Sequence, residues 1–350
     1  MFSSKRTIKK LAIVKLSAMG DIIHAMISLQ FIKKKFPNIQ IDWIVESAFS
    51  QVLENNPDIN NIYKVNLKGI KKDKLSVFSQ IKLIKKISRN NYDLIIDAQG
   101  LIKSSIVSKL LGSNTAGFDK KSTRESLASV FYSKKINIAY EKNVIDRNAK
   151  VISTALDFSI KKEDILTKKP FLFFSKDEKL IDNYIKEDQN NVVFIVGASC
   201  PSKIYSKEKF VKLANKIDSN VLIAWGNIEE KEIAQFISKQ SNAKVLPKLN
   251  LSELKCLIAN SDLVIGNDTG PTHMAWALNI PSITLFGNTP GYRNTYTTKI
   301  NKILESNSEV NPCKLDKNDF SISSIDENKI ESLTNELLKN KEFRIKEENV

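Results

Sequence analysis

One carboxylate near the N-terminus stands in a setting that suits acid–base chemistry. Asp21 lies in the segment KLSAMGDIIHA, directly after the apolar run Leu11–Leu16 and where a helix is expected to begin. Gly20 leaves room there for the backbone to approach a ligand closely. Asp21 could therefore accept a proton from a substrate hydroxyl as a general base. The same residue could instead serve only as a helix cap, worth ~1 kcal/mol, and its type and position leave both interpretations open.

A second polar segment, GNDTGPTHMA (residues 266–275), also follows an apolar run and precedes a helical pattern. Pro271 is typical of a first helical turn. Asp268 and Thr269 would then lie at the helix start, where backbone N–H groups can face an anionic ligand. His273 follows on the same helix and is one of two histidines in the chain. A ligand site is one interpretation, and a helix cap with a structural histidine is the other.

A third segment, GASCPSK (residues 197–203), follows a further apolar run. Small hydroxyl residues such as Ser199 suit a diphosphate when a lysine shares their loop, because Lys203 would neutralise its charge. The alternative for Lys203 is an ordinary surface lysine. The chain has neither a Walker phosphate loop nor the GxGxxG pattern of dinucleotide sites. Cys200 has no histidine near it in sequence, so we expect no cysteine nucleophile.

A fourth segment, DAQGLIKS (residues 97–104), places Lys103 shortly after another apolar run. Arg124 and the basic run Lys68–Lys74 add positive charge in the same half of the chain. Together these side chains could bind an acidic acceptor molecule. Each single cation could equally belong to a solvated surface.

The elements that must position these loops alternate between strand and helix. We expect strands at Leu11–Leu16, Ile41–Val45, Ile62–Val65, Asp93–Ala98, Val192–Val196, Val221–Trp225, Ala243–Leu246, Asp262–Ile265 and Ile283–Phe286. We expect helices at Gly20–Lys35, Leu75–Arg89, Leu101–Leu111, Ser206–Ile217, Glu229–Lys239, Ser252–Asn260, Pro271–Leu278 and Ser324–Lys339. This alternation, in two series, predicts an α/β protein with two Rossmann-like, doubly wound domains.

The predicted domains divide the chain in three. Residues 1–175 form the N-terminal domain, residues 176–323 the C-terminal domain, and residues 324–350 a C-terminal helix with a charged tail. In doubly wound sheets, ligands bind outside the carboxyl ends of the strands. We therefore expect the two domains to face a central cleft, with the four polar segments around it.

Composition narrows the class of protein. The chain has 350 residues, of which 42% are apolar and 27% charged, so it can build two cores. No apolar run approaches the ~20 residues of a membrane span, and no signal-peptide pattern opens the chain. Three cysteines without CxxC spacing indicate neither a disulfide framework nor a zinc cluster, so we expect a cytoplasmic protein without a metal site.

The net charge of +15 is unevenly distributed. Residues 1–150 hold 27 Lys and Arg against 12 Asp and Glu, whereas residues 151–350 hold 27 of each kind. A general enrichment in lysine would spread the excess over the whole chain. The asymmetry instead predicts a polyanionic partner for the first half, such as a phosphate-bearing lipid, a nucleic acid or an acidic sugar.

In these segments the chain resembles the bacterial lipopolysaccharide heptosyltransferases, which have the two-domain GT-B fold. The resemblance extends from Leu11 to about Gly291 and is closest to the heptosyltransferase I branch, which adds the first heptose to Kdo–lipid A. It rests on KLSAMGDIIHA, IDWIVE, DAQGLIKS, RESLASVFY (residues 124–132), AWG followed by a Glu pair, and DTGPTHMAWAL. Six such segments in this order make a specific signal.

The resemblance implies roles for individual residues. The family's catalytic base falls on Asp21. The implied donor-binding residues are Ser199 and Lys203 at the diphosphate, Glu230 (or its neighbour Glu229) at the adenosine ribose, and Asp268, Thr269, Gly270 and His273 at the sugar. Lys103 and Arg124 would lie on the acceptor side. Two positions depart from the family pattern: Ala198 replaces a threonine, and Pro271, where relatives often carry leucine, removes one N–H donor.

The resemblance also implies the reaction and the partners. The implied reaction is an inverting transfer of L-glycero-D-manno-heptose from ADP-heptose to a Kdo hydroxyl of Kdo–lipid A, in synthesis of the lipopolysaccharide inner core. No cofactor and no obligatory metal are expected. We expect a monomer in the cytoplasm, peripherally associated with the inner leaflet of the cytoplasmic membrane.

Other functions compete with this one. Heptosyltransferase II, or another sugar-nucleotide GT-B transferase acting on an extended core, would share the layout, and a catalytically inactive protein could share the fold. A nucleic-acid-binding protein would explain the positive charge. The basic half lacks helix-turn-helix, RRM and zinc-finger patterns, however, so we expect no nucleic-acid partner.

Overall fold

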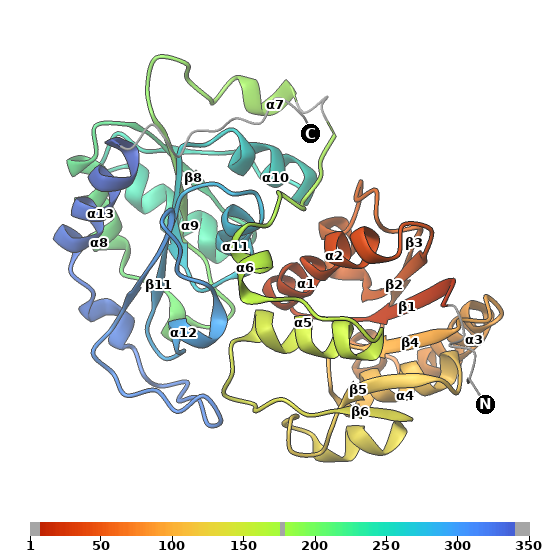
Figure 1. The fold of residues 1–350 in the computed structure, drawn as a ribbon. Helices are drawn as coiled ribbons and strands as arrows, with labels where there is room; N and C mark the ends of the chain where they lie inside the picture. Colours follow the sequence, from red (N-terminus) through yellow and green to blue (C-terminus); the bar gives the residue numbers. More distant parts are fainter. Residues whose placement is uncertain (1–7, 176–178, 340–350) are drawn as a thin grey trace. The chain divides into compact units, whose positions relative to one another are not determined.

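The computed structural model describes residues 8–175 and 179–339. The chain divides into two compact units, Met1–Lys168 and Lys169–Val350, and each is built around one six-stranded sheet (Figure 1). The sequence pattern had placed this boundary after residue 175. The segment after Lys168 belongs to the second unit because Phe171 donates its backbone N–H to the Ala277 carbonyl at 3.2 Å and packs edge-on against Trp276.

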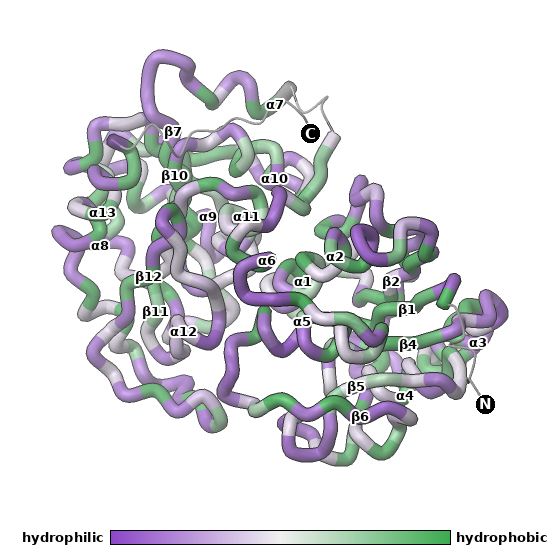
Figure 2. Tube along the Cα trace, viewed as in Figure 1, coloured by the Kyte–Doolittle hydropathy of each residue, from purple (hydrophilic) through white to green (hydrophobic). Residues whose placement is uncertain are grey.

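The sheet of the first unit has the strand order β3-β2-β1-β4-β5-β6, and all neighbouring strands are parallel. Its strands are β1 (Lys10–Val14), β2 (Gln40–Glu46), β3 (Asn61–Val65), β4 (Leu94–Asp97), β5 (Thr115–Phe118) and β6 (Lys134–Ile136). Parallel strands are covered on both faces and therefore read as apolar runs, such as Leu94–Ile96 in the fully buried β4. Figure 2 shows this hydrophobic character along β1.

The helices of the first unit cover both faces of its sheet. They are α1 (Met19–Met26), α2 (Ser28–Lys35), α3 (Ser76–Ser88), α4 (Ile102–Leu111), α5 (Val144–Ala155) and α6 (Lys162–Leu166), with the 3₁₀ turns η1 (Ser47–Val52), η2 (Gly69–Lys71) and η3 (Ser126–Phe131). Helices α1 and α2 pack against α5, whereas α4 packs against α3 and η3. The single helix expected at Gly20–Lys35 is two helices that meet at Ile27.

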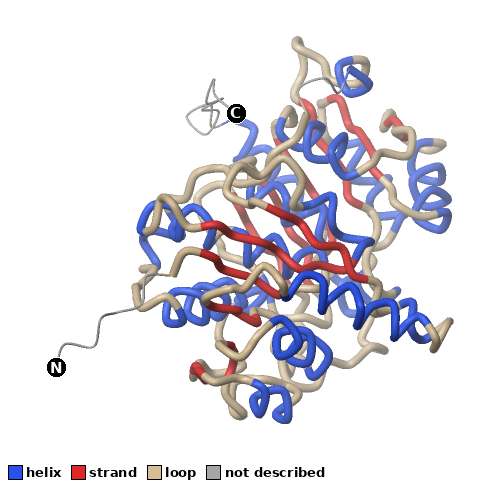
Figure 3. The backbone as a smooth tube through the Cα atoms, turned by 90° about the vertical axis from the view of Figure 1, so that its right-hand side faces the viewer, coloured by secondary structure: helices blue, strands red, loops and turns tan. Residues whose placement is uncertain are grey.

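The sheet of the second unit repeats the first in the order β12-β11-β10-β7-β8-β9, again with all neighbours parallel. Figure 3 shows the strands in red with the helices, in blue, beside them. Its strands are β7 (Asn191–Ile195), β8 (Asn220–Ala224), β9 (Lys244–Val245), β10 (Leu263–Asn267), β11 (Ser282–Phe286) and β12 (Asn301–Glu305). The expected two-unit, doubly wound α/β fold is therefore confirmed. The strands β5, β6 and β12 had not been expected from the sequence.

The helices of the second unit begin at side-chain caps where the sequence provides them. They are α7 (Lys179–Asp182), α8 (Lys207–Lys216), α9 (Ile228–Ser238), α10 (Leu251–Ala259), α11 (Gly270–Ala277), α12 (Gly291–Asn294) and α13 (Glu327–Lys339), with 3₁₀ turns η4 (Pro201–Lys203) and η5 (Ser321–Ser324). Asn227 caps α9 by accepting the N–H of Glu230 at 2.9 Å. Helix α13 buries Ile330 and Leu337 in the core of this unit, so it is not a separate element.

In each sheet, the direction in which successive strands are added reverses at one point. Successive connections run outward in opposite directions from the neighbours β1 and β4 in the first unit and from β7 and β10 in the second. Ligands of open α/β sheets bind at such a switch point, at the carboxyl ends of the strands. The loops that follow these four strands are therefore the places to look for a site.

Candidate functional site

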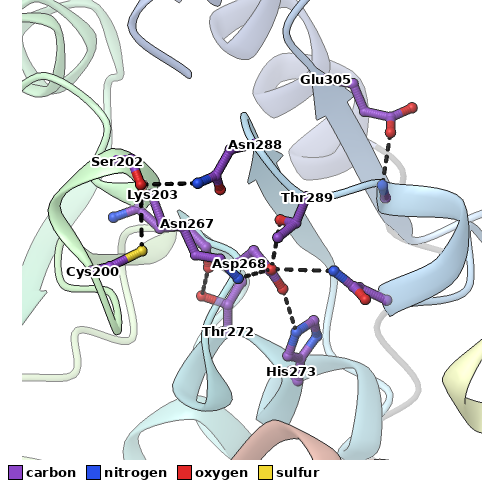
Figure 4. Close-up of polar contacts among 12 residues, drawn as sticks. Cys200, Ser202, Lys203, Asn267, Asp268, Thr272, His273, Asn288, Thr289 and Glu305 are labelled. Carbon is purple, nitrogen blue, oxygen red and sulfur yellow. Dashed lines mark hydrogen bonds and ion pairs between the residues drawn. The ribbon is translucent and has the colours of Figure 1, made fainter. Parts of the chain in front are cut away.

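Asp268 is the centre of a polar cluster in the second unit. It directly follows β10, and its carboxylate lies 2.6 Å from Lys203 Nζ and 3.1 Å from His273 Nε2. Thr289 donates its hydroxyl to the same carboxylate at 2.8 Å (Figure 4). The structure thus brings together Lys203, Asp268 and His273, which the sequence presents in separate segments.

The charges of this cluster depend on one another. Burial would raise the pKa of Asp268, but the Lys203 ammonium and the hydrogen-bonded His273 ring outweigh it and hold that pKa well below its usual range. Asp268 is therefore ionised at neutral pH. The Lys203 side chain remains 17% exposed, so its ammonium can also meet an anion from solvent.

Asn267 fixes the loops around the cluster. Its side chain accepts the backbone N–H of Tyr205 at 3.0 Å and donates to the Val196 and Gly197 carbonyls at 3.0 and 3.2 Å. Thr272 donates its hydroxyl to the Asn267 carbonyl at 2.8 Å. The loop after β7 and the loop after β10 are thus tied to each other by one buried amide.

Thr269 and Gly270 form the start of α11. Thr269 is the N-cap residue, but its side chain makes no capping hydrogen bond, and Pro271 occupies the first turn. The first backbone N–H groups of a helix have no partner within the helix and carry partial positive charge. This helix start can therefore receive an anionic group beside Lys203.

Glu230 lies against the loop after β7, although it comes from the first turn of α9. Its carboxylate accepts the backbone N–H of Gly226 at 2.7 Å and contacts the Asn227 amide at 3.1 Å. A β-carbon at Gly197 would lie 2.1 Å from Glu230 Cδ. Glu229 is exposed, whereas Glu230 is partly covered, so Glu230 is the member of the pair that faces the cluster's loops.

Ser199 lies in the same loop but is exposed, on the stretch between β7 and η4. Its neighbour Ser202 is buried and accepts a hydrogen bond from Asn288 Nδ2 at 2.9 Å. Cys200 lies 3.4 Å from the Ser202 hydroxyl (Figure 4). Ser199 is therefore open to solvent, whereas Ser202 is held within the protein.

A third loop, after β11, completes the cluster and was missed by the sequence analysis. Thr289 and Asn294 both donate to Asp268 Oδ2, at 2.8 and 3.3 Å, and Asn288 bonds to Ser202. Asn288 is 3% exposed, and its Oδ1 is without a hydrogen-bond partner among the described residues. One signal was present: like the other site segments, these polar residues directly follow an apolar run.

Asp21 lies in the first unit, in the first turn of α1 after β1. Its carboxylate accepts the backbone N–H of Ala18 at 3.2 Å, as in a capping box, and its side chain is partly exposed. Gln99, after the neighbouring strand β4, accepts the N–H groups of Leu16 and Ser17 at 3.1 Å each. Asp21 is thus a helix-capping residue and remains accessible on a loop that Gln99 holds in place.

The residues of the fourth segment have separate environments. Lys103 pairs with Glu46 at 3.5 Å. Arg124 is exposed, with no hydrogen bond or ion pair to any residue that the structure describes. Asp97 is fully buried and accepts the Tyr132 hydroxyl at 2.7 Å, and burial raises its pKa despite that hydrogen bond. Asp97 is therefore a structural residue and is not available to an acceptor.

Residues 8–175 and 179–339 show neither a metal site nor a membrane-spanning helix. No group of three His, Cys, Asp or Glu side chains there is placed to hold a metal ion. None of the helices within these ranges is long and apolar enough to cross a membrane.

Two doubly wound parallel sheets, each with polar loops at its switch point, are the architecture of the GT-B class, and solved GT-B heptosyltransferases share this fold. The model of the family described as "Glycosyltransferase family 9 (heptosyltransferase)" matches residues 80–321 of this chain. The chain belongs to this family and is a glycosyltransferase, which confirms the resemblance found in the sequence.

Named relatives agree with this assignment. The chain is 40% identical to "Lipopolysaccharide heptosyltransferase 1" of Campylobacter coli over 344 residues, covering 94% of this chain and 98% of the relative. It is 25% identical to the solved structure of "E. coli heptosyltransferase WaaC with ADP", with a TM-score of 0.77 and coverage of 94% of this chain and 99% of that one. The structure of the same enzyme with ADP-2-deoxy-2-fluoro heptose gives a TM-score of 0.76 at 25% identity, over 93% of this chain and 99% of that one.

Proposed function

We propose that this protein transfers L-glycero-D-manno-heptose from ADP-heptose to a Kdo hydroxyl of Kdo–lipid A, with Asp21 as general base. The Lys203–Asp268–His273 cluster beside the open start of α11 is the observation that carries the proposal. The 40% identity to a protein named lipopolysaccharide heptosyltransferase 1 supports the reaction, and the solved relative with a fluorinated ADP-heptose supports the donor.

The donor would be held through its diphosphate and its ribose. The Lys203 ammonium, the first N–H groups of α11 and the Ser199 hydroxyl would bind the diphosphate. The Glu230 carboxylate would accept the ribose hydroxyls, next to Gly197 where no side chain intervenes. Asp268, Thr269, Gly270 and His273 would line the sugar end.

The chemical step would be an inverting displacement. The acceptor oxygen forms a bond to the anomeric carbon while the bond from that carbon to the diphosphate oxygen breaks, and ADP leaves. Asp21 takes the hydroxyl proton as the oxygen attacks, a contribution of typically ~10²–10⁴-fold. Lys203 and the N–H groups of α11 stabilise the negative charge that develops on the leaving diphosphate. No obligatory metal is part of this proposal.

The acceptor would meet the basic first unit. Lys103 and Arg124 would bind its phosphates and carboxylates. Arg124 is exposed and has no ion pair among the described residues, whereas Lys103 is paired with Glu46. Because lipid A is anchored in a bilayer, the protein would act at the inner leaflet of the cytoplasmic membrane. The monomeric state is a separate expectation. Each basic side chain near such a surface gains about 1 kcal/mol.

A mass-spectrometric transfer assay tests the proposal. Purified protein is mixed with Kdo–lipid A and either ADP-heptose or UDP-glucose, without added metal, beside the Asp21→Asn variant. We expect one heptose to be added from ADP-heptose alone, and the variant to be slower by about two or more orders of magnitude. Transfer that survives in Asp21→Asn removes the base assignment. Transfer only onto an already heptosylated core would instead assign the activity of heptosyltransferase II.

A further inference from the structure

The first unit exposes large apolar side chains on three neighbouring elements. Leu127 and Val130, on η3, are 66% and 70% exposed, and Leu75 and Phe78, at the start of α3, are 75% and 69% exposed. The outer face of α4 adds two isoleucines one turn apart. We call this set the apolar patch: Leu75, Phe78, Ile102, Ile106, Leu127 and Val130.

These three elements form a continuous surface. Helix α4 packs against both α3 and η3. Glu125, directly before η3, accepts the backbone N–H of Ile102 at 2.8 Å, which fixes the start of η3 at the start of α4. A helix of a soluble protein usually buries its apolar side chains. Here α4 and η3, which pack against each other, both expose apolar side chains to solvent. The patch is therefore an apolar surface that the described residues do not cover.

Part of the patch lies at the edge of the sheet that carries Asp21. The starts of α3 and α4 follow β3 and β4, and the segment leading to η3 follows β5. All strands of this sheet are parallel, so these starts lie at its carboxyl edge. The loop that carries Asp21 follows β1 and lies at the same edge. Leu75, Phe78 and Ile102 therefore lie at the same edge as the proposed base. The end of η3, next to Val130, lies toward the amino ends of the strands, because the Phe131 carbonyl accepts the hydroxyl of Thr115, the first residue of β5, at 2.9 Å.

Basic residues predominate in the segments that carry the patch. Residues 68–131 contain 13 Lys and Arg against 5 Asp and Glu, and one of those five, Asp97, is fully buried. Helix α3 carries no acidic residue, and Lys82, Lys85 and Arg89 continue its exposed face beyond Phe78. Exposed lysines also precede the two most exposed apolar pairs, at Lys71, Lys72 and Lys74 and at Lys120 and Lys121.

We propose that the apolar patch docks this protein on an anionic lipid bilayer. Its apolar side chains would enter the interface between headgroups and acyl chains, while the lysines around them contact lipid phosphates. Protein–protein interfaces are depleted in lysine, so an apolar surface on lysine-rich segments fits a membrane better than a protein. The inference rests on the proposed function in one respect: a lipid-anchored acceptor would be presented at the same surface.

Vesicle flotation of the full-length protein tests this surface. The probes are vesicles of phosphatidylethanolamine with ~30% phosphatidylglycerol, and vesicles of phosphatidylcholine alone. The variants are Leu127→Ser/Val130→Ser and, on a separate element, Leu75→Ser/Phe78→Ser. Leu166→Ser is the matched control, because Leu166 is 46% exposed on α6 outside the patch.

We expect the wild-type protein and Leu166→Ser to float with the anionic vesicles and to dissociate as salt rises from ~0.1 M to ~0.5 M. Each double variant should bind at least roughly tenfold more weakly. Equal binding to both vesicle types, or unchanged binding by both double variants, would overturn the proposal. A wild-type dimer in sedimentation that Leu127→Ser/Val130→Ser dissociates would also overturn it and assign the patch to a second copy of this chain.

A transfer assay separates this inference from the proposed function. On a deacylated, water-soluble acceptor the double variants should match the wild type, whereas on vesicle-embedded acceptor they should be slower. If the wild type transfers heptose to neither acceptor but still floats as described, the reaction assignment fails and the docking surface stands. If the double variants match the wild type on both acceptors and in flotation, the docking surface is refuted while the reaction stands.

Discussion

The Glu230 carboxylate fills the space beside Gly197 that any side chain at position 197 would need. Gly197 does not have a positive φ, so its backbone conformation would accept alanine. The constraint at this position is therefore the contact with Glu230 and not the backbone. Gly197 lies in the loop after β7 and Glu230 in the first turn of α9, and their fit fixes where this carboxylate points.

Gly197→Ala should raise the KM for ADP-heptose. The new methyl group displaces Glu230 from the proposed ribose contact, and losing hydrogen bonds to a charged group costs ~1.5–3 kcal/mol, or roughly 10–100-fold in affinity. Steady-state kinetics measures this with kcat expected to change little. Glu230→Asp shortens the carboxylate, so the alanine should cost less in the double variant than alone. Strictly additive effects would show that the two residues do not interact in donor binding.

Gln99 should act as a positioning residue for the base. Gln99→Met removes the acceptor that holds the N–H groups of Leu16 and Ser17, each worth ~1 kcal/mol. We expect kcat to fall roughly tenfold with an unchanged KM for ADP-heptose, because misplacing a catalytic group costs rate rather than donor binding. Gln99→Glu keeps an oxygen acceptor and should recover most of the rate. If Gln99→Glu is as slow as Gln99→Met, the loop is not held in this way.

Lys203→Met should destabilise the protein as well as weaken donor binding. It leaves the buried Asp268 carboxylate with His273, Thr289 and Asn294 but no lysine, a loss of about 3 kcal/mol. The pKa of Asp268 is lowered in the folded state, so its stabilising contribution is present above the unfolded value of 3.8 and is lost as pH falls. The difference between wild type and variant should therefore shrink in acid. Urea unfolding at neutral and acidic pH measures it, and a difference that does not depend on pH would contradict the assignment.

Asp97→Asn should stabilise the protein most at neutral pH. The pKa of Asp97 is raised by burial, so the folded state binds more protons than the unfolded state between 3.8 and the raised value. Wild-type stability is therefore reduced as pH rises through that range. Asparagine keeps an acceptor for the N–H groups of Gln99 and Gly100 without the buried charge. Unfolding free energies of both proteins, compared across pH, would refute this if their difference did not grow with pH.

Much of the fold could be predicted because buried parallel strands leave long apolar runs in the sequence. The strands β5 and β6 could not be predicted from the sequence because their segments, TAGF and KKI, are short and include polar residues or glycine. Their stability comes from tertiary contacts, such as the Thr115 hydroxyl donating to the Phe131 carbonyl at 2.9 Å. Such contacts join residues that a local pattern does not connect.

The candidate site was predicted in part. The rule that useful residues follow strands located Lys203, Asp268 and His273, which the structure brings together. It did not reveal that Asp268 also binds Thr289 and Asn294, because the register of one loop against another depends on the sheet order. For Asp21, Lys103 and Arg124, the structure gives their surroundings, and their roles stay predictions.

The buried Asn267 amide has a thermodynamic consequence for ligand binding. By holding the Val196 and Gly197 carbonyls and the Tyr205 N–H, it orders two loops before any ligand arrives. The conformational entropy of those loops is therefore lost during folding and not on association. A nucleotide bound there should show a small entropic penalty in calorimetry, and its affinity should reflect direct contacts rather than the cost of organising a receptor.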